Sequence, residues 1–180
     1  MASDPGTLED LNRKRTEIRK LLSPTDPADA LTSYYALWHD PRRTQLTLHY
    51  DERNRPGGFI TISQTGADLF RPLVTLRAPD RVSAANLLRT ALSAGRPYYL
   101  TVPLALASVM RDQLEISRSR LNCVYLLNPT HFQPVLNVLV QRTTSADDVP
   151  RFQIESQNQL VAMSGTNWRS PSFAEVFVFV

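Results

Sequence analysis

The chain has 180 residues, of which 42% are apolar and 21% are charged, as is typical of a globular protein with a sizeable core. No apolar run approaches the ~20 residues that a membrane helix needs, and the N-terminal Met-Ala-Ser-Asp-Pro-Gly lacks the basic and apolar regions of a signal peptide. A net charge of +3 does not by itself indicate nucleic acid as a partner, and the single cysteine, Cys123, excludes an internal disulfide, so we expect a cytoplasmic protein.

Two helices are predicted before the first strand. Residues 1–25 contain a basic helix that Thr7 can cap, with acidic residues in its first turn and Arg19 and Lys20 in its last turn, which matches the helix dipole at both ends. A second helix begins at Asp26, with Pro27 in its first position, and is closed by His39-Asp40-Pro41. Its buried side is predicted to consist of Leu31, Tyr34, Tyr35, Leu37 and Trp38.

Strands and helices then follow in a regular succession. Three strands are predicted at residues 45–51, 59–64 and 72–77, with Arg55-Pro56-Gly57-Gly58 as the turn between the first two. Next come a helix at 80–94, a strand at 97–102, a helix at 104–114, and strands at 121–127 and 134–142. Residues 143–150 are polar and contain Asp147-Asp148, so we predict a linker there.

The last thirty residues predict a three-stranded meander. Its strands are expected at 151–155, 159–166 and 173–180, separated by turns at Gln157-Asn158 and Arg169-Ser170-Pro171. In the closing strand, Phe173, Glu175, Phe177 and Phe179 share one face, while Ala174, Val176, Val178 and Val180 share the other. Because both faces are apolar, we expect this strand to lie in the middle of a sheet and to be covered on two sides.

The order of the predicted elements resembles the GCN5-related N-acetyltransferase (GNAT) fold. Two helices, three antiparallel strands, helix, strand, helix and two more strands would make residues 26–142 one degenerate GNAT-like domain. Residues 151–180 resemble the first strands of a second, incomplete domain, as in two-domain bacterial members of the superfamily. The expected fold class is therefore α/β of the α+β kind: a mixed, mostly antiparallel sheet flanked by helices, followed by the meander.

The resemblance implies acetyl transfer from acetyl-coenzyme A to an amine. In that family the cofactor lies where the fourth strand splays from the fifth, and backbone groups at the end of the fourth strand pair with its pantetheine arm. Val178, Phe179 and Val180 match this stretch, and Glu175 matches a position that serves as general base in some members. A carboxylate on a phenylalanine-rich face would be desolvated, which suits it to accepting a proton; the alternative is a structural carboxylate paired with Arg169 or with backbone amides.

The sequence departs from the family at the loop that binds the cofactor's pyrophosphate. No glycine loop or helix follows Val180, and residues 77–84 contain no glycine, while Pro79 removes a backbone donor. We therefore expect a GNAT-like protein that is unable to bind acetyl-coenzyme A by itself and is inactive as this chain. The alternatives are a non-catalytic accessory subunit, or an enzyme completed by a second chain.

An uncovered closing strand predicts a protein partner, either a second copy or a larger assembly, because unpaired strand edges and exposed apolar surface favour pairing. The basic first helix is an alternative docking surface for an acidic partner, a membrane surface or nucleic acid. Its own acidic residues, Glu9, Asp10 and Glu17, weaken that interpretation.

Other kinds of site have little support in the sequence. His39, His49 and His131 lie on separate elements without the short spacing of a metal site, so we expect no metal. The sequence contains neither a phosphate-binding P-loop nor a dinucleotide-binding fingerprint. Cys123 lies in a predicted strand and has no context that would activate it as a nucleophile.

Overall fold

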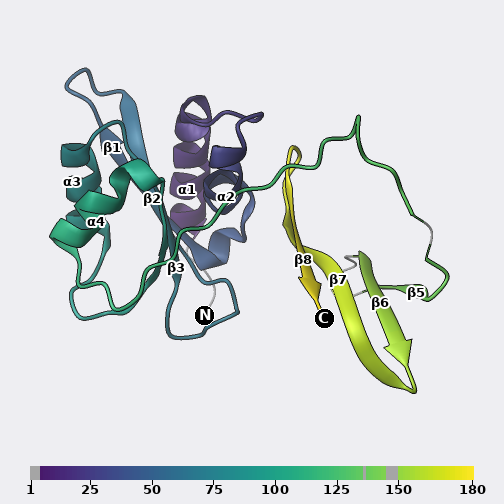
Figure 1. The fold of residues 1–180 in the computed structure, drawn as a ribbon. Coiled ribbons are helices and arrows are strands. Elements are labelled where there is room, and N and C mark those ends of the chain that lie inside the picture. Colours follow the sequence, from purple (N-terminus) through teal and green to yellow (C-terminus); the bar gives the residue numbers. More distant parts are fainter. Residues whose placement is uncertain (1–4, 136, 145–149) are drawn as a thin grey trace. The chain divides into compact units, whose positions relative to one another are not determined.

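A computed structural model describes residues 5–135, 137–144 and 150–180 (Figure 1). The chain divides into two compact units, residues 1–123 and residues 124–180. The described residues form four α-helices and two four-stranded sheets, one in each unit. The α+β class is therefore confirmed.

The first unit begins with helical segments. They are α1 (Pro5–Ile18), η1 (Arg19–Leu21), η2 (Pro27–Asp29), α2 (Ala30–Ser33) and the π-helical turn η3 (Tyr34–Trp38). Asp26 caps η2 as predicted, because its side chain accepts a hydrogen bond from the backbone N–H of Ala28. The prediction that Trp38 is buried is wrong: it is 45% exposed, with the guanidinium of Arg19 over its ring.

The sheet of the first unit follows a short turn, η4 (Pro41–Arg43). Its strands are β1 (Thr44–Tyr50), β2 (Pro56–Ser63), β3 (Leu73–Arg77) and β4 (Tyr99–Thr101), in that spatial order. β1, β2 and β3 are antiparallel neighbours, whereas β4 runs parallel to β3. The connections are completed by α3 (Arg81–Ala91), η5 (Leu104–Leu106) and α4 (Ala107–Gln113).

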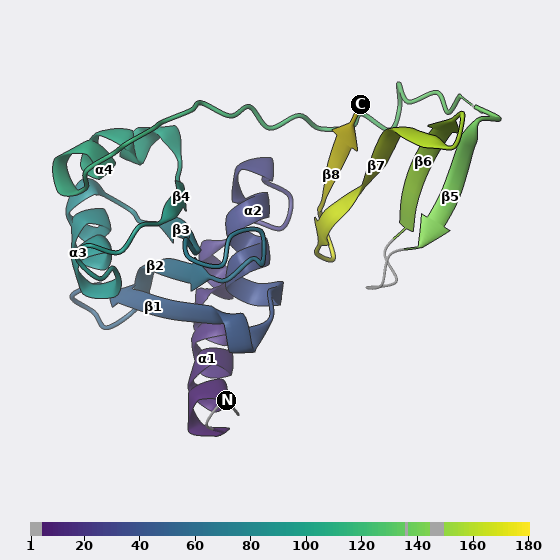
Figure 2. The same cartoon turned by 90° about the horizontal axis from the view of Figure 1, so that it is seen from below.

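Helices cover both faces of this sheet (Figures 1 and 2). α3 and α4 bury one face, where Ile60, Val74 and Leu76 pack against residues such as Leu88 and Met110. The N-terminal helical segments bury the other face, where the core residues are Leu11, Ile18, Leu22, Ala36, Leu46 and Phe59. Successive residues of β2, such as Phe59 and Ile60, therefore pack into opposite cores, which explains why this inner strand is apolar on both sides.

The second unit is a meander of four strands (Figure 2). These are β5 (Val140–Thr144), β6 (Pro150–Ser156), β7 (Gln159–Arg169) and β8 (Ala174–Phe179), each antiparallel to the next. Gln157 and Asn158 have positive φ, as a two-residue hairpin turn requires, so the predicted turn is confirmed. A hydrogen bond from Ser170 N–H to the Phe173 carbonyl closes the second predicted turn.

Three predictions for the strands are also wrong. Pro56, Gly57 and Gly58 belong to β2, and the turn lies before them, where Asn54 takes a positive φ. Residues 121–127 and 134–135 form no strand, and Cys123 is exposed. β8 lies at the edge of its sheet, not in the middle. A local apolar pattern cannot specify which partner strand a segment finds, and that is where these predictions failed.

The boundary of the compact units also falls inside the predicted first domain, between Cys123 and Val124. Most of the predicted linker at 143–150 lies outside the described residues, because 145–149 are not described. Its two ends pair with each other, Thr144 with Pro150, as parts of β5 and β6. Both ends of the predicted linker therefore belong to one sheet.

His39 connects the end of η3 to β1 and gives the fold a pH dependence. Its Nδ1 lies 2.7 Å from the Thr44 hydroxyl, which donates to the Asp40 carbonyl and so accepts from His39. Burial lowers the pKa of His39, with Arg15 and Arg43 acting in the same direction and Asp40 opposing them. The neutral ring is thus favoured in the folded state.

We expect the melting temperature to fall as the pH is lowered below about 6.5, the ordinary pKa of histidine in an unfolded chain. A depressed folded-state pKa contributes stability that is complete above the unfolded value and is lost as the pH falls through the folded value. Melting curves between about pH 7.5 and pH 5.5 test this. The slope should be smaller in His39→Gln, and an equal slope in both proteins would contradict the role of His39.

Candidate functional site

The pairing between the two parallel strands of the first unit stops before β3 ends. Their register ends at Thr75 and Thr101, whereas β3 continues to Arg77. A hollow of about 550 Å³ lies beyond this point, lined by Lys20, Leu21, Arg77, Ala78, Pro79, Pro103, Ala105 and Leu106. Ligands of α/β sheets bind at the carboxyl ends of parallel strands. The first unit therefore has a candidate site between the end of β3, η1 and η5.

Arg77 is held in this site by a buried acid. Asp29, whose side chain is 3% exposed, accepts a hydrogen bond from Nη1 of Arg77 and another from the backbone N–H of Ser23 at 2.9 Å. The ion pair therefore ties η2 to the end of β3, and the hydrogen bond from Ser23 adds the loop before η2. The sequence does not reveal this pair, because the two residues are 48 positions apart and neither lies in a recognisable motif.

The N-terminus of α3 follows shortly after β3 and is capped by the side-chain carboxylate of Asp80. Asp80 Oδ1 accepts the Ser83 backbone N–H at 2.8 Å, and its Oδ2 accepts the Ser83 hydroxyl at 3.1 Å. The hydrogen bond from the Ser83 backbone is the main reason that the pKa of Asp80 is lowered. The negative charge that a helix N-terminus attracts is therefore supplied internally.

Ser83 also lies close to His49 of β1, a contact that the sequence did not predict. Their Oγ and Nε2 atoms are 3.1 Å apart. A serine nucleophile needs a base to accept its proton and needs access for the substrate. Here the Ser83 hydroxyl donates to Asp80, and the residue is 5% exposed. The arrangement is therefore a helix cap that joins α3 to β1, not a catalytic dyad.

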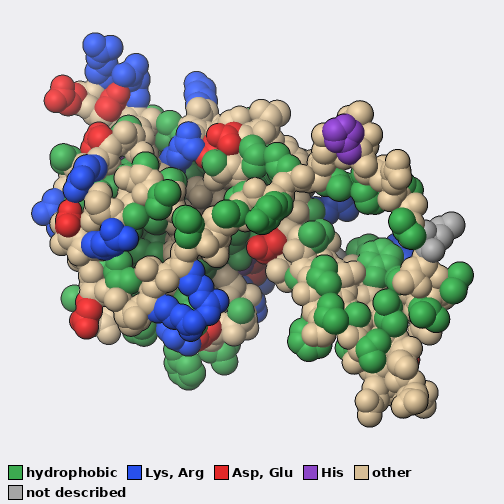
Figure 3. All heavy atoms as spheres, in the orientation of Figure 1, with side chains coloured by type: hydrophobic (Ala, Val, Ile, Leu, Met, Phe, Trp, Pro, Cys, Tyr) green, Lys and Arg blue, Asp and Glu red, His purple; other side chains and the backbone are tan. Residues whose placement is uncertain are grey.

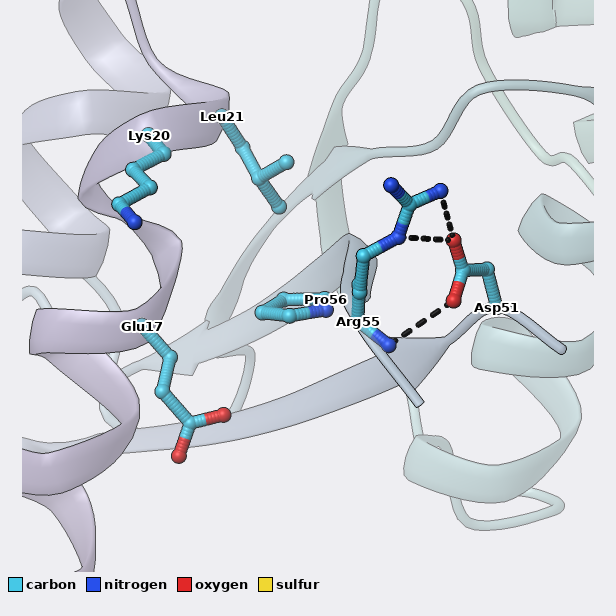
Figure 4. A pocket seen from close by; sticks show the side chains of 6 residues that line it. All are labelled: Glu17, Lys20, Leu21, Asp51, Arg55 and Pro56. Atoms are coloured by element: carbon cyan, nitrogen blue, oxygen red, sulfur yellow. Dashed lines mark hydrogen bonds and ion pairs between the residues drawn. The ribbon is translucent and has the colours of Figure 1, made fainter. Parts of the chain in front are cut away.

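A second hollow of about 340 Å³, shown in Figure 4, shares Lys20 and Leu21 of η1 with the first. It is lined by Glu17, Lys20, Leu21, Asp51, Arg55 and Pro56. Arg55 forms an ion pair with Asp51, donating two hydrogen bonds to its Oδ2, from Nε at 3.0 Å and from Nη2 at 2.8 Å. Glu17 accepts hydrogen bonds from Arg13 and from the Tyr50 hydroxyl. Because these charges compensate one another, this hollow offers less to a charged ligand than the first.

Most cations of the basic first helix are also engaged. Arg13 pairs with Asp10 and Glu17, and Lys14 pairs with Asp10. Arg15 donates to the backbone carbonyls of Ala36 and His39 at 3.0 and 2.6 Å. This internal pairing disfavours α1 as a docking surface for nucleic acid or an anionic membrane.

The residues predicted to act in the second unit lie on its edge strand. Glu175 is exposed and accepts a hydrogen bond from Asn167 Nδ2 at 3.1 Å, so the expected desolvation of its carboxylate is wrong. Its neighbour is Asn167, not the Arg169 that the sequence suggested. Val178 and Phe179 pair with Ser164 and Met163 of β7, and Val180 follows the strand. Their catalytic and cofactor-binding roles stay predictions.

Comparisons with known protein families, curated proteins and solved structures found no match. In the described part of the chain, His, Cys, Asp and Glu side chains form no group of three or more that could hold a metal ion. None of the helices within the described ranges is long and apolar enough to cross a membrane.

Proposed function

We propose that this chain is a GNAT-like protein that does not hold acetyl-coenzyme A in its first unit and that acts by binding rather than by acetyl transfer. The site at the carboxyl ends of β3 and β4 is its candidate binding site. Asp80 at the N-terminus of α3 is the observation on which the proposal depends.

The order of elements in the first unit supports the likeness to the family. Helical segments, three antiparallel strands, a helix, a strand parallel to the third, and a further helix follow one another from α1 to α4. The pairing of β3 with β4 ends at Thr75 and Thr101, and the resemblance would place the family's splay between cofactor-binding strands at this point. The last two strands expected of the family, at 121–127 and 134–142, are not part of this sheet.

The residues present do not fit the cofactor's pyrophosphate. The family binds it with backbone amides at the start of the helix that follows the fourth strand. In this chain Pro79 lacks an N–H, and the Asp80 carboxylate takes the Ser83 N–H that would face phosphate. A pyrophosphate would meet a negative charge where the family offers donors.

Isothermal titration calorimetry tests this proposal. We expect no saturable heat from acetyl-coenzyme A at concentrations up to about 1 mM, where even a weak site of about −4 kcal/mol would be half filled. Asp80→Ser is the matched variant, because serine retains the cap and removes the charge. Saturable binding of acetyl-coenzyme A to the unmodified chain, with the same affinity in Asp80→Ser, would contradict the proposal.

The edge strand of the second unit supports a second candidate function, self-association. Val176 and Val178 are each 73% exposed and Phe179 is 60% exposed, and among the described strands β8 pairs only with β7. Hydrophobic side chains gather on the visible surface of the second unit (Figure 3). An apolar edge strand without lysine or proline is a template for pairing with another strand.

The charges on β8 are compatible with its pairing to β8 of a second copy of the chain. An antiparallel pair of β8 strands centred on Phe177 would place Val176 opposite Val178 and Glu175 opposite Phe179. The two Glu175 carboxylates would then lie well apart, so that no like charges would face each other. We therefore propose β8 pairing as the route to a dimer.

We expect the mass measured by light scattering after size-exclusion chromatography to rise with protein concentration. Val176→Lys should keep the chain monomeric over the same range, since a charge on an edge strand opposes strand pairing. Leu160→Lys, at an exposed position of β7, is the control and should leave association unchanged. A concentration-independent monomer would rule this candidate out.

A further inference from the structure

The hollow beyond β3 and β4 differs from the other surface hollow in the balance of its charges. Its lining includes two cations, Arg77 and Lys20, and no acid, whereas the second hollow, which Lys20 also lines, contains Glu17 and Asp51. Behind the lining, the buried Asp29 compensates part of the charge of Arg77. Counting two positive charges against one negative charge leaves a net charge of +1 at the site.

The two cations are held in different ways. Arg77 is fixed, because the buried Asp29 accepts a hydrogen bond from its Nη1, and the Arg77 side chain as a whole is 40% exposed. Lys20 is exposed, and within the residues that the structure describes it takes part in no ion pair. One cation is therefore preorganised and the other is free to close over a ligand.

The side chains of the remaining lining residues are apolar. It consists of Leu21, Ala78, Pro79, Pro103, Ala105 and Leu106. A volume of about 550 Å³ lies within the range of small-molecule sites. Side chains without polar groups cannot satisfy a second charged group on a ligand, so one charge and a short hydrocarbon tail match this lining.

We propose that this hollow binds a small organic monocarboxylate with a short apolar chain, its carboxylate between Lys20 and Arg77 and its chain against Pro103 and Leu106. Arg77 suits a carboxylate because guanidinium and carboxylate match in geometry. The assignment rests on the proposed function in one respect: no pyrophosphate at the N-terminus of α3 competes for the adjoining space.

Three probes of equal chain length test this assignment: hexanoate, hexylamine and 1-hexanol. Each is titrated into ¹⁵N-labelled protein and followed through the backbone amides of Ala78, Ala105 and Leu106. We expect saturable shifts at these amides with hexanoate, weaker binding of hexanol and none of hexylamine. Lys20→Gln should weaken hexanoate binding roughly threefold to fivefold, the scale of a solvent-exposed ion pair.

Lys14→Gln is the control, since Lys14 lies on α1 and pairs with Asp10. It should leave the hexanoate affinity unchanged. Equal binding of hexylamine, an unchanged affinity in Lys20→Gln, or no shift with hexanoate would each overturn the assignment. A titration with acetyl-coenzyme A distinguishes failure of this assignment from failure of the proposed function. Saturable binding of acetyl-coenzyme A overturns the proposed function. If neither acetyl-coenzyme A nor hexanoate binds, only the monocarboxylate site is overturned.

Discussion

Replacing Gly58 with alanine is expected to lower the free energy of unfolding of the first unit by about 2–3 kcal/mol. A Cβ at this position would lie 2.8 Å from the Arg77 carbonyl oxygen and 3.2 Å from the Ala78 Cα. Both atoms belong to the backbone, so β2 and the end of β3 would have to move apart. The glycine therefore allows the close approach from which the candidate site begins.

Gly57→Ala provides a matched control from the adjacent residue. A Cβ there meets only the His49 ring, at 3.9 Å, which is an ordinary contact. We expect its effect to stay within about 0.5 kcal/mol. Urea unfolding followed by Trp38 fluorescence, in a Trp168→Phe background, reports on the first unit. If Gly58→Ala and Gly57→Ala lower the free energy of unfolding equally, the approach of β2 to β3 is not tight.

Arg77→Leu is expected to lower the free energy of unfolding by about 2–3 kcal/mol, because it leaves the buried Asp29 carboxylate without its cation. The cost lies below that of a fully buried pair, since the Arg77 side chain is 40% exposed. Ser23 N–H remains as a partner of Asp29 at 2.9 Å and limits the loss further.

Arg81→Leu is the control for this variant. Arg81 pairs with Asp112 at 3.1 Å, and both side chains are at least 60% exposed. Removing this ion pair should lower the free energy of unfolding by less than about 1 kcal/mol. Asp29→Asn combined with Arg77→Leu should recover part of the stability lost in Arg77→Leu, because no uncompensated charge is then buried. If the double variant is less stable than Arg77→Leu, the cost does not arise from the carboxylate.

Local signals in the sequence predicted much of the fold. Asp26-Pro27 is a start signal that depends only on neighbouring residues, and the cap forms as expected. The Gln157-Asn158 turn is a signal of the same kind. Each depends on a hydrogen bond or a backbone conformation within about four residues.

The failures concern partners that are distant in the chain. Residues 121–127 have the composition of a strand but find no neighbouring strand, and β8 has two apolar faces yet lies at an edge. The same limit applies to the site. His49 and Ser83 are 34 positions apart, so their contact depends on how β1 packs against α3. Sequence patterns specify which residues favour burial, but tertiary pairing decides which residues meet.

Nuclear magnetic resonance at the first turn of α3 tests the central claim most directly. Acetyl-coenzyme A is titrated while the backbone amides of Val82, Ser83 and Ala84 are followed. With the Asp80 carboxylate holding the Ser83 N–H, these three resonances should stay unshifted up to about 1 mM ligand. Saturable shifts of all three in the unmodified chain would show that a phosphate displaces the carboxylate, and would contradict the account.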